Sequence, residues 1–193
     1  MNLSAILYNK GFIFFDGVEY SKKYLDFLLN KSNYIENMEW PVRNILFRTS
    51  IPPELNIFCL LPSFIQDQYR EQKVIWNAKM VHKGYVVRPH RDAVFVYDYL
   101  PGEVIIILWI TPEPYEGREF VYGRIKDLSK IETKISDNVI TQLGIYDSNL
   151  EIHGMVKPKT GMGVLIDRTN PIWWHSVEEL TTDSRVISIG GFV

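Results

Sequence analysis

Three potential metal ligands and one arginine carry the clearest chemical signal in this sequence. His90 and Asp92 form a His-x-Asp pair directly after Arg88 and Pro89. On a β-strand, residues i and i+2 point to the same face, so both side chains can reach one ion. Taken alone, the pair is better explained as a surface histidine and a turn aspartate, so a metal site requires a further ligand.

His175 supplies that ligand. It lies in the aromatic and apolar run Trp173-Trp174-His175-Ser176-Val177. A buried histidine needs partners for its ring nitrogens, and the alternative for His175 is a hydrogen-bonded core residue. Two histidines and one carboxylate form a ligand set that suits non-haem Fe(II) and leaves coordination positions open. The sequence therefore predicts a metal site of His90, Asp92 and His175.

Arg185 follows His175 after a polar, turn-like segment and opens an apolar run that ends at Val193. A hairpin over this segment would return Arg185 beside the strand that carries His175. The planar guanidinium binds a carboxylate through two parallel hydrogen bonds. That carboxylate belongs either to a small ligand or to the protein itself. The spacing from His175 favours the ligand.

The elements that must position these residues are mostly short strands. The pattern predicts a strand over 11–15 and helices over 21–29 and 62–72, whereas the rest of 30–75 has no clear pattern. Turn signals separate β-rich runs at 85–87, 93–99, 104–111, 119–122, 139–145, 162–166 and 185–193. Many short strands with turns between them predict an antiparallel sandwich or barrel.

Composition limits the class of protein. The 193 residues are 46% hydrophobic and 23% charged, which predicts a folded chain with its own core. A net charge of −2 argues against nucleic-acid and membrane partners. The single cysteine, Cys59, excludes a disulfide framework and fits a reducing compartment. The longest apolar run is far shorter than the roughly 20 residues of a membrane helix. We expect one domain over 1–193 and a soluble, cytoplasmic protein.

The order His90-Arg91-Asp92, His175, Arg185 resembles the Fe(II)- and 2-oxoglutarate-dependent oxygenase superfamily. The stretch 84–92 resembles the Gly-x-x-Tyr-x-x-His-x-Asp segment of its prolyl-hydroxylase-like branch. Residues 117–120 resemble a Gly-Gly-Glu-Phe turn, and 158–166 resemble the strand before the distal histidine. The resemblance implies a mainly β (α+β) fold with a double-stranded β-helix (jelly-roll) core over about 81–193. A helical and mixed part, about 1–80, would pack its helices against this core.

The resemblance also assigns roles. It implies that His90, Asp92 and His175 ligate Fe(II), and that Arg185 holds the distal carboxylate of 2-oxoglutarate, with O2 as the second co-substrate. Val87 stands where the branch has tyrosine, so a second hydrogen bond to the co-substrate must come from elsewhere. The candidates are Tyr97, Tyr99 and Ser188, although Ser188 is an odd number of residues from Arg185 and should face the other way.

The remaining expectations concern the substrate. Arg118 replaces the second glycine of the turn, and Arg118, Trp173 and Trp174 are candidate substrate contacts. One of the two tryptophans should be core, because alternate strand residues face opposite sides. The expected activity is hydroxylation of an unactivated C–H bond in a small molecule, such as an amino acid or its derivative, with release of succinate and CO2. The alternatives are a prolyl-type peptide or protein hydroxylase, a non-catalytic jelly roll, and a metal-binding jelly roll that uses no 2-oxoglutarate. The sequence leaves the oligomeric state open.

Overall fold

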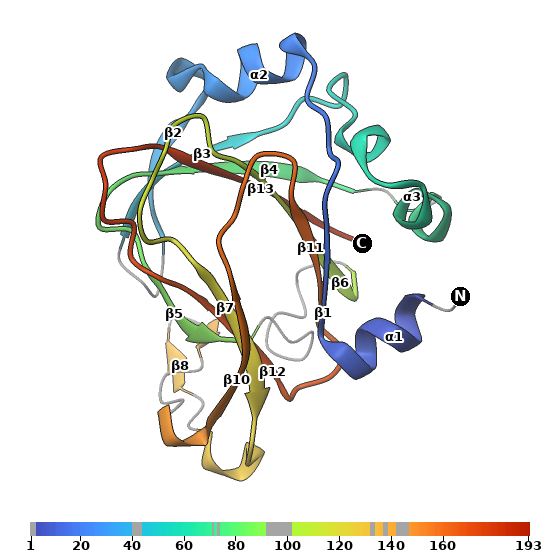
Figure 1. The fold of residues 1–193 in the computed structure, drawn as a ribbon, viewed down its shortest axis with the longest axis vertical. Coiled ribbons are helices and arrows are strands. Elements are labelled where there is room, and N and C mark those ends of the chain that lie inside the picture. Colours follow the sequence, from blue (N-terminus) through green and yellow to red (C-terminus); the bar gives the residue numbers. More distant parts are fainter. Residues whose placement is uncertain are drawn as a thin grey trace.

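The computed structural model describes residues 3–39, 44–70, 72, 74–91, 102–131, 134–136, 139–141 and 147–193. Two antiparallel sheets face each other, and α-helices lie against the outer face of the larger sheet (Figure 1). The helices are α1 (Leu3–Lys10), α2 (Lys22–Leu29) and α3 (Ser63–Tyr69). Short 3-10 turns are η1 (Lys31–Asn33), η2 (Ile57–Leu60), η3 (Leu128–Lys130) and η4 (Asp147–Asn149).

The large sheet has seven strands. Its order is β1 (Phe12–Phe15), β11 (Gly163–Asp167), β6 (Val104–Ile110), β13 (Val186–Phe192), β4 (Trp76–Val81), β3 (Asn44–Ser50) and β2 (Ile35–Glu39). The small sheet has the order β10 (Leu150–Val156), β7 (Phe120–Ile125), β12 (Trp173–Val177) and β5 (Val87–His90). A separate hairpin pairs β8 (Lys134–Ser136) with β9 (Val139–Thr141).

Alternation along β13 separates the two faces of the large sheet. Ile187 and Ile189 belong to the outer cluster, which also contains Leu7 of α1 and Leu28 of α2. Phe192 packs instead against an inner cluster that draws residues from both sheets: Phe12, Ile105, Trp109, Phe120, Val164, Ile166 and Trp173. Because strand residues alternate between faces, the even-numbered positions of β13 face the space between the sheets.

One end of this interior is filled by a separate cluster, which we call the end cluster. Its buried members are Leu46, Val81, Tyr85, Leu180 and Val186. Val186 begins β13 and Val81 ends β4, and the two are cross-strand partners. Apolar side chains therefore close the interior at this end.

The structure confirms the predicted mainly antiparallel β architecture with helices packed against it. The strands predicted over 11–15, 104–111, 119–122, 162–166 and 185–193 are present, as are both predicted helices. The strand predicted at 85–87 lies at Val87–His90 instead. The run 93–99 and part of 139–145 lie outside the described residues.

The mixed part before residue 80 contributes strands to the large sheet, since β1 to β4 all join it and β4 pairs with β13 over its whole length. One prediction about connectivity is wrong. The segment before Arg185 is no hairpin. It crosses from β12 in the small sheet to β13 in the large one, so Arg185 does not return beside the strand of His175.

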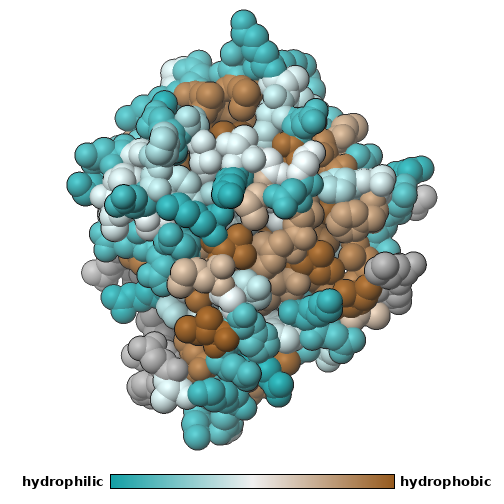
Figure 2. All heavy atoms as spheres, in the orientation of Figure 1, coloured by the Kyte–Doolittle hydropathy of each residue, from teal (hydrophilic) through white to brown (hydrophobic). Residues whose placement is uncertain are grey.

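Seen from outside, apolar side chains gather across the middle of the face shown in Figure 2, inside a rim of polar ones. Within the described ranges, no helix combines the length and apolar character needed to cross a bilayer.

Candidate functional site

His90 and His175 lie together on neighbouring strands of the small sheet. They are direct cross-strand partners of β5 and β12, and their ring centroids are 4.2 Å apart. Two imidazoles that bind one metal at a right angle place their ring centres about 4–5 Å apart, since each nitrogen lies about 2 Å from the ion. The observed pair therefore has a spacing that fits a shared metal ion.

The backbone fixes the tautomer of His90. Its Nδ1 lies 2.8 Å from the carbonyl oxygen of Arg88. A carbonyl only accepts, so Nδ1 carries the hydrogen and donates it. The Nε2 lone pair is then available as a metal ligand, an arrangement that is common among metal-bound histidines.

Aromatic rings hold His175 in place. Its side chain is 5% exposed, and its ring stacks on Phe120 with centroids 5.2 Å apart and planes 17° apart. Phe12 of β1 meets the same ring edge-on at 6.2 Å. These contacts fix the ring orientation and exclude water around it.

Arg91 ties the end of β5 to the segment before β12. Its guanidinium Nη1 donates to the carbonyl oxygen of Pro171 at 2.9 Å, and the residue is 8% exposed. Burial lowers the pKa of this guanidinium from its usual value. The bond links the residue after His90 to the chain that leads into Trp173, and so supports the register between the two histidines.

Three predicted site residues, Asp92, Tyr97 and Tyr99, lie outside the described residues. In the sequence, Asp92 follows His90 by two positions. Among the residues that are described, no group of three histidine, cysteine or acidic side chains is close enough to hold a metal ion. The structure thus brings together two of the three predicted ligands, and the third stays a prediction.

Arg185 pairs with a carboxylate of the protein. Its Nη2 lies 3.0 Å from Oε1 of Glu113, and its side chain is one-third exposed. From the spacing between His175 and Arg185, the sequence analysis favoured the carboxylate of a ligand over this internal ion pair. The spacing argument failed because it assumed a hairpin, whereas Arg185 lies just before β13 in the other sheet. Its predicted role toward 2-oxoglutarate stays a prediction.

Ser188 faces the space between the sheets, on the face of β13 opposite to that of Ile187 and Ile189. Its cross-strand partners are Trp109 on β6 and Lys79 on β4. Trp109 belongs to the inner cluster and contacts Phe120 with ring centroids 5.8 Å apart. Sequence reasoning missed Lys79. The signal was the alternation in Trp76–Val81, where apolar residues at 76, 78 and 80 leave Lys79 on the opposite face.

The two adjacent tryptophans face opposite sides. Trp173 belongs to the inner cluster with Phe12 and Phe120, and therefore lies on the same side as His175. Trp174 packs on the outer side of the small sheet with Val121 and Ile125. Trp174 is therefore a core residue, as expected for one of the two tryptophans, and its predicted substrate contact stays a prediction.

Arg118 lies beside the end cluster. Its guanidinium packs over Tyr85 of the end cluster at 4.7 Å, and the residue is 4% exposed. Its φ of 68° is in the left-handed region that glycine adopts most easily. The turn thus keeps a glycine-like backbone despite the substitution.

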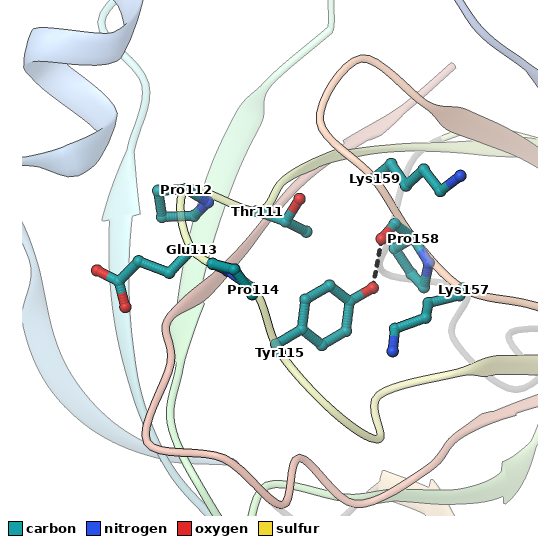
Figure 3. A pocket seen from close by; sticks show the side chains of 8 residues that line it. All are labelled: Thr111, Pro112, Glu113, Pro114, Tyr115, Lys157, Pro158 and Lys159. Atoms are coloured by element: carbon teal, nitrogen blue, oxygen red, sulfur yellow. Dashed lines mark hydrogen bonds between the residues drawn. The ribbon is translucent and has the colours of Figure 1, made fainter.

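Two cavities lie outside the histidine site. One, of about 340 Å³, follows β6, where the Tyr115 hydroxyl donates to the Pro158 carbonyl and Lys157 lies over the Tyr115 ring (Figure 3). The other, of about 710 Å³, lies between α1 and α3 and is bordered by Tyr69 and Asp167. Neither is lined by His90 or His175.

No family model and no curated protein matches this sequence. Solved structures do match it over nearly its whole length. A Pseudomonas putida prolyl-4-hydroxylase superposes with a TM-score of 0.62 at 14% identity, covering 98% of this chain and 96% of that one. An oxidoreductase of the 2OG-Fe(II) oxygenase family from Burkholderia pseudomallei gives 0.58 at 13% identity, covering 97% and 88%. HygX from Streptomyces hygroscopicus, solved with nickel, 2-oxoglutarate and hygromycin B, gives 0.55 at 12%, covering 100% and 87%.

The chain therefore has the jelly-roll fold of the 2-oxoglutarate- and Fe(II)-dependent oxygenases. The resemblance found in its motifs and the likeness of its two sheets lead to the same class of fold.

Proposed function

We propose that this protein is an Fe(II)- and 2-oxoglutarate-dependent dioxygenase that hydroxylates an unactivated C–H bond. The observation that carries the proposal is the pair His90 and His175, facing each other on adjacent strands with ring centroids 4.2 Å apart. Facing imidazoles next to a buried aromatic cluster suit a metal centre that must be kept from bulk water.

His90, His175 and Asp92 would hold the iron. Two histidines and one carboxylate are the donor set that suits non-haem Fe(II) and leaves room for further ligands. With 2-oxoglutarate and O2, the bound iron supplies the oxidising power, and succinate and CO2 are released. The presence of Asp92 in the sequence supports hydroxylation over halogenation, since halogenating relatives lack this carboxylate.

The chain itself supplies orientation and exclusion of water. The Arg88 carbonyl holds His90 in the tautomer that presents Nε2, and Phe120 holds the plane of the His175 ring. Trp173 and Phe12 wall the same side of the interior, with ring centroids 6.3 Å apart. Such walls keep a bound substrate close to the metal and limit side reactions with water.

For the substrate we propose a small molecule, such as an amino acid or its derivative. The nearly buried His175 supports this, because a reacting group must enter the space between the sheets to approach it. HygX, with hygromycin B bound, is a neighbour of the same fold that takes a small molecule. The second candidate is a prolyl residue of a peptide, supported by the motif at 84–92 and by the likeness to the Pseudomonas putida prolyl-4-hydroxylase.

An anaerobic titration tests the proposal. We expect 2-oxoglutarate, added to the Fe(II)-loaded protein, to produce the visible charge-transfer band of a metal-chelated 2-oxo acid. The His175→Ala variant, folded to the same extent by circular dichroism, should give no band. If the folded, iron-loaded wild type gives no band either, the proposed function is wrong.

The substrate class has its own test. Wild-type enzyme with iron, 2-oxoglutarate and O2 is incubated with free amino acids and, separately, with proline-containing peptides. Gain of one oxygen atom in a free amino acid, coupled to extra succinate, supports the small-molecule proposal. Gain in the peptides alone assigns the protein to the second candidate.

A further inference from the structure

Next to the histidine pair, the small sheet carries a row of three inward-facing side chains on β12, β7 and β10. Trp173 is the cross-strand partner of Arg124, and Arg124 is the partner of Glu151. Direct cross-strand partners share one face of a sheet. Because Trp173 belongs to the inner cluster, Arg124 and Glu151 face the interior as well. We call Trp173, Arg124 and Glu151 the charged row.

The charged row lies at the end of the interior that is opposite to the end cluster. Strand β12 begins at Trp173 and ends at Val177, shortly before Leu180 of the end cluster. Trp173 is buried, whereas Arg124 and Glu151 are exposed although they face inward. Inward-facing side chains are exposed only where the interior is open to solvent. The charged row is therefore at a place where a small molecule can enter the space between the sheets.

Within the described structure, the opposite charges of Arg124 and Glu151 are neighbours that do not pair with each other. Oε1 of Glu151 lies 3.7 Å from Nε2 of His153 on the same strand. A carboxylate has about four acceptor sites, so this contact leaves Glu151 able to bind a ligand. The guanidinium of Arg124 can bind a carboxylate through two parallel hydrogen bonds. Both charges are thus available to one small molecule.

The spacing of the two charges suits a zwitterion. Cβ atoms of direct antiparallel partners are about 4.5–5.5 Å apart. In an α-amino acid, the ammonium and the carboxylate are attached to one carbon atom, so a single molecule can reach Arg124 and Glu151 together. A residue within a peptide chain has neither of these charged groups. The charged row therefore suits a free amino acid better than a peptide.

The distance from the charged row to the histidines suits the side chain of an amino acid. Trp173 precedes His175 by two residues, which is about 6.5–7 Å along a strand. A side chain that extends three or four bonds from Cα spans about 4–5 Å of this distance. Phe12 and Phe120 both contact the His175 ring, so the space that receives the side chain is apolar. An apolar side chain is favoured there.

We propose that the substrate is a free, apolar α-amino acid whose carboxylate is bound by Arg124 and whose ammonium group is bound by Glu151. Trp173 lies beside the bound zwitterion, and the apolar side chain is directed toward His175. The inference rests on the proposed function, because hydroxylation takes place at the metal. It names the class of small molecule and the two residues that select it.

The first test measures binding rather than turnover. Five apolar amino acids, L-valine, L-leucine, L-isoleucine, L-methionine and L-phenylalanine, are titrated by anaerobic calorimetry into wild type loaded with Fe(II) and 2-oxoglutarate. The tightest binder is then compared with the carboxylic acid that lacks its ammonium group and with the amine that lacks its carboxylate. Each analogue should bind about 10-fold to 100-fold more weakly, because each loses a charge-assisted hydrogen bond.

Two variants should each remove one of these preferences. Arg124→Gln should weaken the amino acid about 10-fold to 100-fold and leave the amine within about twofold of wild type. Glu151→Gln should weaken the amino acid equally and leave the carboxylic acid within about twofold. A merely structural role would weaken all three ligands alike. Both residues are exposed, so both variants should fold, and thermal unfolding checks this.

The exposed ion pair of Arg70 and Asp67 on the other side of the molecule supplies matched controls. Nη2 of Arg70 lies 2.7 Å from Oδ1 of Asp67, and both side chains are mostly exposed. Arg70→Gln and Asp67→Asn remove the same charges as the two test variants. We expect their affinities for all three ligands to stay within about twofold of wild type, because an exposed ion pair contributes little.

The outcomes separate this inference from the proposed function. Unchanged amino-acid affinity in Arg124→Gln or Glu151→Gln, or equal loss of all three ligands, overturns the inference. A wild type that gives the charge-transfer band with 2-oxoglutarate but binds none of the five amino acids overturns it as well. A folded, iron-loaded wild type without that band contradicts the proposed function itself, whatever the variants do.

Discussion

The two inner faces of the barrel differ in chemistry. The small sheet presents His90 and His175 among aromatic rings, with Phe120 stacked on His175. The large sheet presents Lys79 and Ser188, which are cross-strand partners on β4 and β13 and face the same interior. Strand residues alternate between the two faces of a sheet, so both sheets contribute side chains to this interior. The comparison shows that the two sheets bring side chains of different polarity into one interior.

The largest effect should come from the small sheet. His175→Ala removes a predicted ligand, and we expect Fe(II) affinity to fall at least about 100-fold, beyond the loss typical of outer-shell changes. Succinate formation should vanish while the fold persists. Isothermal titration measures the iron affinity, and circular dichroism measures the fold.

His153→Ala is the matched control for this loss. The ring centroid of His153 lies 5.7 Å from that of Trp173. Its Nε2 lies 3.7 Å from Oε1 of Glu151, on the same strand, β10. We expect unchanged iron affinity in this variant. Equal losses in the two histidine variants would show that the metal is not held by the facing pair.

The adjacent residues Trp173 and Trp174 test the difference between the inner and outer faces of the small sheet. Trp174 is 2% exposed on the outer side of the small sheet, so Trp174→Ala should cost about 3–5 kcal/mol of unfolding free energy through the cavity it leaves. The affinity for 2-oxoglutarate should not change. Trp173→Ala should destabilise as well, and should also shift the charge-transfer band, because its ring lies on the side of His175. Urea unfolding measures the stability of the two variants, and the anaerobic titration measures their charge-transfer bands. A band shift in Trp174→Ala but not in Trp173→Ala would contradict the assignment of the two tryptophans to opposite faces.

The smallest predicted effect lies outside both inner faces, at Tyr115. Burial raises the pKa of Tyr115 from 10.0 to about 12, with Glu119 adding to the shift and Arg118 opposing it. Because the folded-state pKa is raised, the neutral hydroxyl stabilises the folded protein fully below pH 10. This stabilisation is lost as the pH rises toward 12. Since Tyr115 is only partly buried, we expect the loss to be about 1 kcal/mol.

Tyr115→Phe tests this pH dependence. The variant lacks the hydrogen bond to the Pro158 carbonyl, so it should be less stable than wild type at pH 8 by about 1 kcal/mol. The difference should shrink between pH 10 and pH 12 in urea unfolding. A difference that stays constant over this range would contradict the predicted titration.

The sequence predicted local features better than connections. The strand signals around 104–111 and 162–166 held because apolar β-rich runs between turns are determined by nearby residues. The prediction of a hairpin before Arg185 was wrong, because a polar, turn-like segment has the same sequence pattern whether the chain reverses within one sheet or crosses to another. The pairing of β13 with β4 and β6 decides between these, and it depends on residues far away in the chain.

The candidate site shows the same limit. His90 and His175 were identifiable because their residue types and setting already suggest metal binding, and the structure pairs them. Lys79 was not identified, because a lysine in a strand is usually solvated. Its inward position follows from the register with Ser188 and Trp109, which the sequence does not reveal.

The most direct test of the account is anomalous diffraction from crystals grown anaerobically with Mn(II) and 2-oxoglutarate. The account predicts one strong anomalous peak between the Nε2 of His90 and the ring of His175, with the 2-oxo acid bound at the same metal. A metal peak away from these two histidines would contradict the account.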